Sequence, residues 1–196
     1  MKTKALIAVA ALGAAAFSLP ATAQMSMSSA YIGGGFGQSK FSDGCQGAGG
    51  VGVSCDDKDT SFKIFGGYQF NKNIAAEVGY TDLGKAKASG PGGSAEAKAT
   101  AWELDAVGSF PVWQQLSILG RLGLYYGEGK IDAPGVSGKK NTTDLTYGLG
   151  VGYDFTRNLG VRGEWQRYSK VKFEAGGGSG DTDVDVFGVS VLWRFQ

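Results

Sequence analysis

The stretch Ser61-Phe-Lys-Ile-Phe-Gly-Gly-Tyr-Gln-Phe70 decides the fold of this chain, because apolar and polar residues alternate along most of it. The even positions include Phe62 and Ile64, whereas the odd positions include Lys63 and Gln69. An alternation with a period of two residues places the two kinds of side chain on opposite faces of a strand. The stretch therefore predicts a β-strand with one apolar and one polar face.

The same alternation recurs along the rest of the chain. It resumes after three residues in Ile74–Thr81, and a weaker copy, Tyr31–Ser39, precedes the first stretch. Five further copies are Trp102–Phe110, Ile118–Tyr126, Leu145–Phe155, Leu159–Trp165 and Phe187–Phe195. An even number of amphipathic strands of about ten residues is typical of an outer-membrane barrel with a polar interior. We predict an all-β fold, an eight-stranded antiparallel up-and-down transmembrane β-barrel.

The start of the chain has the pattern of a secretory signal peptide. Two lysines near Met1 precede the apolar segment Ala5–Phe17, and Ala21-Thr-Ala23 supplies small residues for cleavage before Gln24. The alternative is an anchor helix that stays in place, but the apolar segment is shorter than the roughly 20 residues that span a bilayer. We expect residues 1–23 to be a cleaved signal peptide and residues 24–196 to form one barrel domain.

The charge of the chain is nearly balanced. Removal of residues 1–23 removes two lysines and no acids, which changes the net charge from +1 to −1. A balanced chain lacks the basic surface that nucleic-acid binding requires, so we expect no nucleic-acid partner. The exported leader and the amphipathic strands together predict the cell outer membrane as the location.

The connections between the strands alternate between short and long. Outer-membrane barrels keep short turns on the periplasmic side and long loops outside, so this alternation orients the barrel. The predicted periplasmic turns are Asn71–Asn73, Pro111–Gln114 and Thr156–Asn158. The four predicted extracellular loops are Ser42–Asp59, Gly84–Lys98, Gly127–Asn141 and Ser169–Asp181.

Aromatic residues on the apolar faces gather near the ends of the strands, as in the two aromatic girdles of membrane barrels. Those near the long loops are Phe62, Tyr80, Trp102, Tyr126, Tyr147, Trp165 and Phe187, and those near the short turns are Tyr68, Phe70, Phe110, Tyr153, Phe155, Trp193 and Phe195. A soluble barrel would turn these rings inward and crowd its core. The girdles favour the membrane barrel.

Several segments resemble one known family. They are Gly67–Gly84, Leu145–Phe155, Val161–Trp165 and the closing Trp193-Arg-Phe195. These segments are similar to the small outer-membrane β-barrels that include the transmembrane domain of outer membrane protein A. The resemblance covers essentially the whole chain after the signal peptide, and it implies a fold and a membrane more than an activity.

The polar faces of the strands predict a cluster of ion pairs in the lumen. Its members are Lys63, Glu77, Glu103, Asp105, Arg121, Arg162, Glu164 and Arg194. An eight-stranded barrel is only wide enough for side chains to fill it, so the charges must neutralise one another. The cluster is either a structural plug or a gate for small ions. For the gate, the resemblance implies Arg162 and Glu164 as the internal pair, with Glu77 and Lys63 as partners.

Catalytic and cofactor chemistry finds little support in the sequence. The chain contains no histidine, which removes the Ser-His-Asp arrangement and the histidine base of lipid or peptide hydrolases. The segment Asp181-Thr-Asp-Val-Asp185 has calcium-like spacing, but Val186 stands where the loop needs glycine. A solvated acidic rim is the preferred interpretation, and a surface cation shared with lipopolysaccharide is the alternative. We expect no enzyme activity, no cofactor and no metal site.

The two cysteines, Cys45 and Cys55, both lie in the first predicted long loop. An exported protein passes through an oxidising compartment, so a disulfide between them is the natural interpretation, with free thiols or a metal pair as the alternative.

The sequence as a whole predicts a monomeric outer-membrane barrel with a structural or surface-interaction role. Its expected partners are outer-membrane lipids, lipopolysaccharide and the barrel assembly machinery, together with an extracellular ligand that the sequence does not identify. A narrow porin-like channel for ions or small solutes is the second hypothesis, and a lipid-modifying enzyme is the third.

Overall fold

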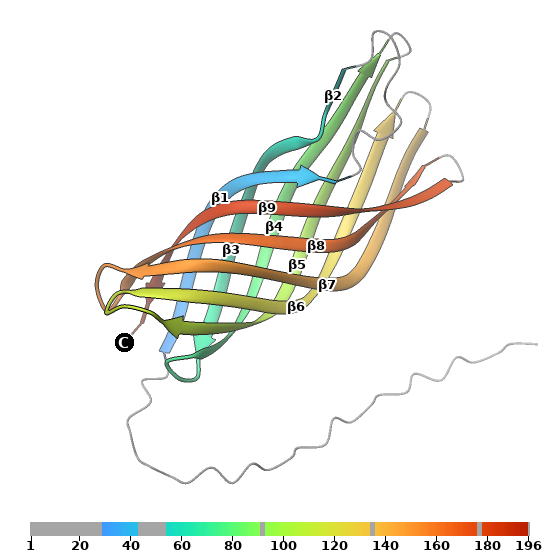
Figure 1. Cartoon of the computed structure of the whole chain (residues 1–196). Helices are drawn as coiled ribbons and strands as arrows, with labels where there is room; N and C mark the ends of the chain where they lie inside the picture. Colours follow the sequence, from blue (N-terminus) through green and yellow to red (C-terminus); the bar gives the residue numbers. More distant parts are fainter. Residues whose placement is uncertain (1–28, 43–53, 91–92, 134–135, 176–177, 196) are drawn as a thin grey trace, which may run out of the picture.

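The computed structural model describes residues 29–42, 54–90, 93–133, 136–175 and 178–195, and the predicted signal peptide lies outside them. The described chain consists of β-strands joined by turns (Figure 1). The strands are β1 (Ser29–Phe41), β2 (Ser54–Asp56), β3 (Lys58–Gln69), β4 (Ile74–Gly90), β5 (Gly93–Pro111), β6 (Leu116–Ala133), β7 (Val136–Asp154), β8 (Leu159–Ala175) and β9 (Gly178–Arg194). Among the described residues, no helix is long and apolar enough to cross a membrane.

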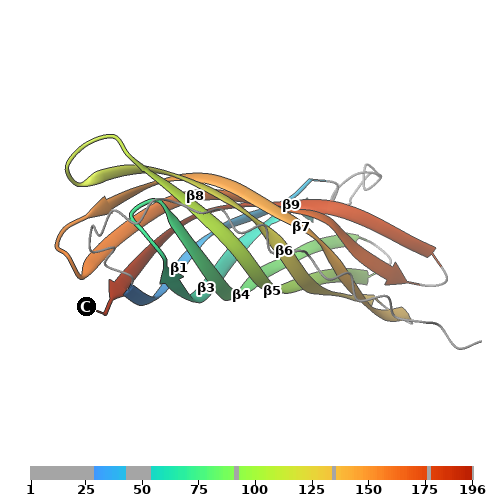
Figure 2. The same cartoon turned by 90° about the horizontal axis from the view of Figure 1, so that it is seen from below.

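The long strands form a closed barrel (Figures 1 and 2). Each long strand pairs antiparallel with its neighbours in the chain, and β1 pairs with β9 to close the sheet. The short β2 pairs with the far end of β4, on the same edge of β4 that β3 pairs with nearer the short turns. The predicted eight-stranded antiparallel barrel is therefore confirmed. Closure pairs the sheet edges that an open sheet would leave exposed.

The predicted long loops are a point where the sequence interpretation was wrong. Strands make up most of the segments Gly84–Lys98, Gly127–Asn141 and Ser169–Asp181. In each of the three hairpins, pairing continues to the tip, where the last two paired residues are three positions apart in the sequence. Antiparallel pairing satisfies the backbone groups of these segments, so they need no lipid to remain ordered. We call this part of the barrel, beyond the aromatic residues of the long-connection end, the extension. In the first predicted loop, Ser42–Asp59, β2 and the first residues of β3 are strand, and residues 43–53 lie outside the described part.

The outer surface of the barrel is apolar over its middle. Leu149 is 63 % exposed and Leu122 is 60 % exposed, and neither points into the lumen. Large exposed side chains of the same kind follow β3 to β9, and the aromatic residues predicted for the two girdles lie among them or are half-exposed. An outward apolar band between two aromatic girdles is the surface that a transmembrane barrel presents to lipid.

The interior has three layers along the barrel axis. An apolar cluster near the short turns contains Tyr31, Phe65, Ala75, Val107 and Leu192. A polar layer follows, and a second apolar cluster fills the base of the extension. We call this second cluster the upper cluster, and its members are Phe41, Leu83, Ala86, Ala99, Ala101, Tyr125, Tyr168, Val171, Phe173 and Val184.

Candidate lumen ion-pair network

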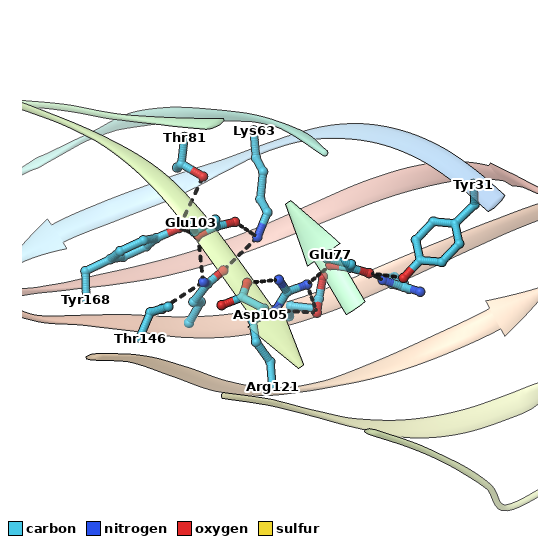
Figure 3. Close-up of polar contacts among 12 residues, drawn as sticks. Tyr31, Lys63, Glu77, Thr81, Glu103, Asp105, Arg121, Thr146 and Tyr168 are labelled. Carbon is cyan, nitrogen blue, oxygen red and sulfur yellow. Dashed lines mark hydrogen bonds and ion pairs between the residues drawn. The ribbon is translucent and has the colours of Figure 1, made fainter. Parts of the chain in front are cut away.

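Arg121 of β6 is the centre of the polar layer. Its Nη1 lies 2.5 Å from Oδ2 of Asp105, and its Nη2 lies 2.8 Å from Oε2 of Glu77 and 2.9 Å from Oε1 of Glu164. Figure 3 shows the guanidinium between Asp105 and Glu77. Its side chain is 2 % exposed, and those of Glu77 and Asp105 are no more so. A guanidinium satisfies several carboxylates at once because its donors fan out in a plane.

Glu77 of β4 links Arg121 to a second arginine. Its Oε1 accepts a hydrogen bond from the Tyr31 hydroxyl at 2.6 Å and one from Arg162 Nη1. The Arg162 guanidinium also lies 5.3 Å from the centroid of the Tyr31 ring and 5.9 Å from that of Phe65. Cation–π contacts of this kind favour the charged guanidinium in a desolvated place. Glu77 therefore bridges the two arginines in the described lumen.

Glu103 of β5 organises a second group of contacts on the side of the extension. It forms an ion pair with Lys63, and its Oε2 accepts hydrogen bonds from Tyr168 at 2.6 Å and from Gln166 at 3.0 Å. Gln166 also donates to Thr146 and accepts from Lys63. Figure 3 shows these contacts as one connected set beside the Arg121 group. The buried polar atoms of this layer thus mostly satisfy one another.

Alternation and glycine together place these side chains. All the charged members lie on the polar parity of their strands, because every second residue of a strand faces the lumen. Gly123 is directly opposite Asp105 in the β5–β6 pair, and a Cβ there would overlap the Asp105 carboxylate. Small residues inside the lumen therefore leave the volume that the ionised side chains fill.

The structure brings together seven of the eight residues of the predicted cluster. Arg194 lies apart, near the short turns, where its Nη1 contacts Oδ1 of Asp154 at 2.8 Å. The two neighbouring sets of contacts together hold three cations, Lys63, Arg121 and Arg162, against four carboxylates, Glu77, Glu103, Asp105 and Glu164.

Several members of the network are neutral, and the sequence interpretation did not single them out. These members are Tyr31, Thr81, Thr146, Gln166 and Tyr168, which form hydrogen bonds with the charged residues or with one another. Tyr31 and Thr146 have the inward parity, which was an available signal. Tyr168 lies beyond the predicted end of its strand at Trp165, so recognising it required the true length of β8.

The two ends of the polar layer differ. Toward the extension, the upper cluster covers it, and the Tyr125 hydroxyl donates to the Ser169 carbonyl at 2.5 Å across the lumen. Toward the short turns, a cavity of about 1100 Å³ opens at the barrel end, and its lining includes Arg162, Arg194 and Asp154. Described side chains therefore fill the lumen more completely on one side of the network than on the other.

The cysteine and calcium hypotheses gain little from the structure. Cys55 lies in β2 and is not a free cysteine. Cys45 lies outside the described residues. The Cys45–Cys55 disulfide stays a prediction. In the calcium-like segment, Asp183 and Asp185 contact Arg167, and the described residues contain no group of three metal-ligating side chains.

A comparison with protein families identifies the chain. The model of the outer membrane protein beta-barrel domain matches residues 9–195. The chain belongs to this family. Membership places it in the cell outer membrane and, by the rule for such barrels, orients the short turns toward the periplasm and the extension toward the outside.

Two relatives of this chain are proteins named outer membrane protein A. The protein from Yersinia pseudotuberculosis is 29 % identical over 200 residues, which cover 99 % of this chain and 55 % of the relative. The one from Klebsiella pneumoniae is 29 % identical over 137 residues, covering 67 % of this chain and 40 % of the relative. The chain thus spans about half the length of these relatives.

Solved structures share the fold. Neisserial surface protein A superposes with a TM-score of 0.62 at 16 % identity, over 85 % of this chain and 97 % of that one. OprG from Pseudomonas aeruginosa gives 0.56 at 17 % identity, over 87 % and 97 %. Ail from Yersinia pestis, solved with the heparin analogue sucrose octasulfate, gives 0.54 at 17 % identity, over 86 % and 99 %. At these identities the likeness shows the barrel architecture.

Proposed function

We propose that this outer-membrane barrel is a closed structural element of the cell surface, whose lumen network is a plug. The observation that carries the proposal is the sequence of layers across the lumen. The ion pairs of Arg121, Arg162 and Lys63 stand between the upper cluster and the apolar cluster near the short turns. An ion that entered would have to break buried charge pairs and then pass an apolar constriction, and both steps are costly.

The test is current recorded across planar bilayers containing the refolded full chain. The proposal expects no steady conductance from the wild type, because the upper cluster blocks the path even when the network rearranges. The variant Arg162→Ala and the surface control Arg167→Ala are recorded under the same conditions, since Arg167 contacts Asp185 and Asp183 outside the lumen. Steady wild-type conductance that changes in Arg162→Ala but not in Arg167→Ala would overturn the plug.

A gated narrow pore is the second candidate, and the periplasmic cavity favours it. That cavity already reaches Arg162 from the short-turn end, so the polar layer and the upper cluster are what a small ion would still have to cross. In this alternative, Arg162 leaves Glu77 and opens the layer. The bilayer measurement described above distinguishes the two candidates directly.

The remaining features follow the same proposal. The apolar outer band would be covered by membrane lipid, which supports a monomer, and assembly would use the barrel assembly machinery common to such proteins. We propose residues 1–23 as a cleaved leader and the Cys45–Cys55 disulfide as a restraint on the first extracellular connection. The lack of histidine in the whole sequence supports a role without catalysis.

A further inference from the structure

Strand β8 leaves its neighbour β7 at the base of the extension. The ladder between the two strands ends at Thr146 and Tyr168, although both strands continue beyond it. On β9 the ladder with β1 ends at Val184. Farther out, the described ladder pairs of this hairpin join only Val171–Ala175 to Gly178–Thr182. We call these two segments the arm, and Figure 1 shows them in orange and red as a hairpin distinct from that of β6 and β7.

The arm lies across the inside of the outer end of the barrel. The carbonyl oxygen of Lys172 would be 2.6 Å from a Cβ at Gly129, and the N–H of Lys172 donates to Oγ1 of Thr142 at 3.0 Å. Gly129 of β6 and Thr142 of β7 both have the inward parity of their strands. Since β6 is not a neighbour of β8 in the sheet, the backbone of β8 reaches it over the inner face of β7. The arm therefore covers the outer mouth of the lumen.

Two apolar side chains of the arm close this mouth. Val171 and Phe173 are buried in the upper cluster, and the Phe173 ring lies over Gly129. Ala99 of β5 is directly opposite Gly129, belongs to the same cluster and is 0 % exposed. Both positions depend on the arm for their cover.

Side-chain contacts attach the arm to the opposite wall. Besides the bond of the Lys172 N–H, the Tyr125 hydroxyl donates to the carbonyl of Ser169 at the base of the arm. Lys140 forms an ion pair with Glu174 at 2.6 Å, but both side chains are exposed, and exposed pairs contribute little. A ladder would instead supply backbone hydrogen bonds all along the strand.

The other two long hairpins of the extension are attached by such a ladder. The hairpin of β4 and β5 and that of β6 and β7 pair with each other as far as Glu96 and Asp132. A hairpin held by side chains can separate from the wall while its own ladder stays intact, which requires less free energy than opening a ladder. The arm is therefore the part of the described extension that moves most easily as a unit.

A bulge with a strained backbone lies where the arm joins the barrel. The register of β8 and β9 shifts between Tyr168 and Val171, and Lys170 within this bulge has a φ of 52°. This left-handed conformation is uncommon for a residue other than glycine and persists where surrounding contacts enforce it. Asp183 supplies such a contact, because its Oδ1 accepts a hydrogen bond from the Lys170 N–H at 3.0 Å. Rotation at Lys170 would relieve the strain and carry the arm away from the wall.

We propose that the arm is a hinged lid over the outer end of the lumen. It rotates at Lys170 between the closed position of the structure and an open position in which outside solution reaches the upper cluster. The lid acts outside the polar layer, and that layer stays closed when the lid opens. The proposal therefore goes beyond the plug, and the conductance test and the test of the lid can fail separately.

The first measurement follows a thiol placed beneath the lid. The full chain carrying Ala99→Cys is refolded in vesicles and treated with iodoacetate, and peptide mass spectrometry follows modification at that position alone. Lys98→Cys, on the outward face, gives the rate of an uncovered thiol. Thr142→Val removes the acceptor of the Lys172 N–H and should speed modification about fivefold, which corresponds to about one hydrogen bond. Thr143→Val is the matched control, exposed on the outward face, and should leave the rate unchanged.

The second measurement distinguishes a swinging lid from a fraying hairpin. The N–H of Lys172 is bonded to β7, whereas that of Phe173 points toward β9, because these groups alternate along a strand. Tyr125→Phe removes a different attachment of the arm, so it should speed amide exchange at Lys172 and leave exchange at Phe173 unchanged. Amide exchange is measured by NMR in phospholipid nanodiscs. Equal acceleration at both residues would show fraying and overturn the lid.

The hinge is tested by variants of Lys170. Lys170→Gly should slow modification of Ala99→Cys several-fold, because glycine adopts a positive φ without strain and favours the closed position. Lys170→Val should speed it, because a β-branched residue resists a positive φ. Heat-modified gel mobility verifies that all variants fold. Equal rates in the two Lys170 variants, equal effects of Thr142→Val and Thr143→Val, or no modification of Ala99→Cys before the barrel unfolds would each overturn the proposal.

Discussion

The membrane-spanning part of the barrel and its extension consist of the same strands, but the apolar face points outward in the membrane-spanning part and inward in the extension. On β5, Leu104 faces lipid while Asp105 faces the lumen, but farther along Lys98 faces outward while Ala99 is buried inside. On β6, Leu122 and Lys130 share the outward face in the two parts. The inward face changes from charged to apolar over a few residues, and the outward face does the reverse.

This difference shows that the medium outside the barrel, lipid or water, determines which face of a strand is apolar. In lipid the apolar side chains face out and the polar groups must pair inside, as Arg121 does with its three carboxylates. In water the apolar side chains move inside, as Phe173 and Val171 do in the upper cluster. The same contrast applies to ion pairs, which are buried in the lumen and exposed in the extension.

The largest expected effect comes from breaking the buried network at its centre. Arg121→Ala leaves three carboxylates without their shared cation, and loss of one partner of a buried pair typically costs about 3 to 5 kcal/mol. The control Arg167→Ala removes a partly exposed pair with Asp185 and should cost about 1 kcal/mol or less. Denaturant titration in lipid vesicles measures both. Equal losses would mean that the lumen pairs are solvated like those of the extension.

A charge on the lipid face should have the next largest effect. Leu149→Arg on β7 places a guanidinium near the middle of the apolar band, at a cost of about 2 to 4 kcal/mol. Thr143→Arg is the control, because Thr143 is exposed on the same face of the same strand, beyond the aromatic level. It should cost about 1 kcal/mol or less. The same titration tests the assigned depth, and a similar loss for both variants would contradict it.

Truncation inside the extension should act locally. The Phe173 ring covers Gly129 of β6, where an added Cβ would come within 2.9 Å of two ring carbons. Phe173→Ala leaves a cavity in the upper cluster, but the extension can open without unfolding the barrel in the membrane. We expect roughly tenfold faster amide exchange at the ends of β6 and β8 and nearly unchanged exchange near the short turns. Uniformly faster exchange would show that the two parts unfold together.

The smallest effect is expected from the exposed pairs of the extension. Hydrogen bonds from Lys139 and Lys130 hold the pKa of Glu128 below its usual range. A lowered pKa in the folded state means that the stabilisation is present above the pKa of the unfolded chain, about 4.3, and is lost as the pH falls through the folded value. This stabilisation should be too small to measure, because exposed pairs contribute little, so Glu128→Gln should leave stability at pH 7 unchanged within error. A clear loss at pH 7 that vanishes in acid would show a stronger pair than its exposure implies.

The prediction from sequence was most successful where lipid imposes the pattern. The stretch from Ser61 to Phe70 and its copies gave the strand number and the facing of the side chains, because an apolar outward face in lipid requires strict alternation. The extension was missed because it lacks this apolar outward face. Its apolar residues, such as Ala86, Ala97 and Ala99 on the inward face, are small and follow the reverse parity, so the segments were interpreted as loops.

In the lumen the sequence indicated which residues point inward but not which of them meet. Glu77 and Arg121 are 44 positions apart, and Arg162 reaches Glu77 from 85 positions away. Such partners depend on the stagger of the strands around the barrel, which alternation within one strand does not encode. The separation of Arg194 from the network and the inclusion of Tyr168 both follow from that stagger.

The sequence by itself determined the membrane class, the strand count, the facing of each residue in the membrane and the charges that would be confined to the lumen. Those properties depend on the period of a strand and on the solvent at each face, and both can be read locally. The tertiary structure decided the length of the hairpins and the pairing of Arg121 with three carboxylates. These depend on how separate strands are placed beside one another, because charges and apolar side chains interact with whatever neighbour closure of the barrel brings to them.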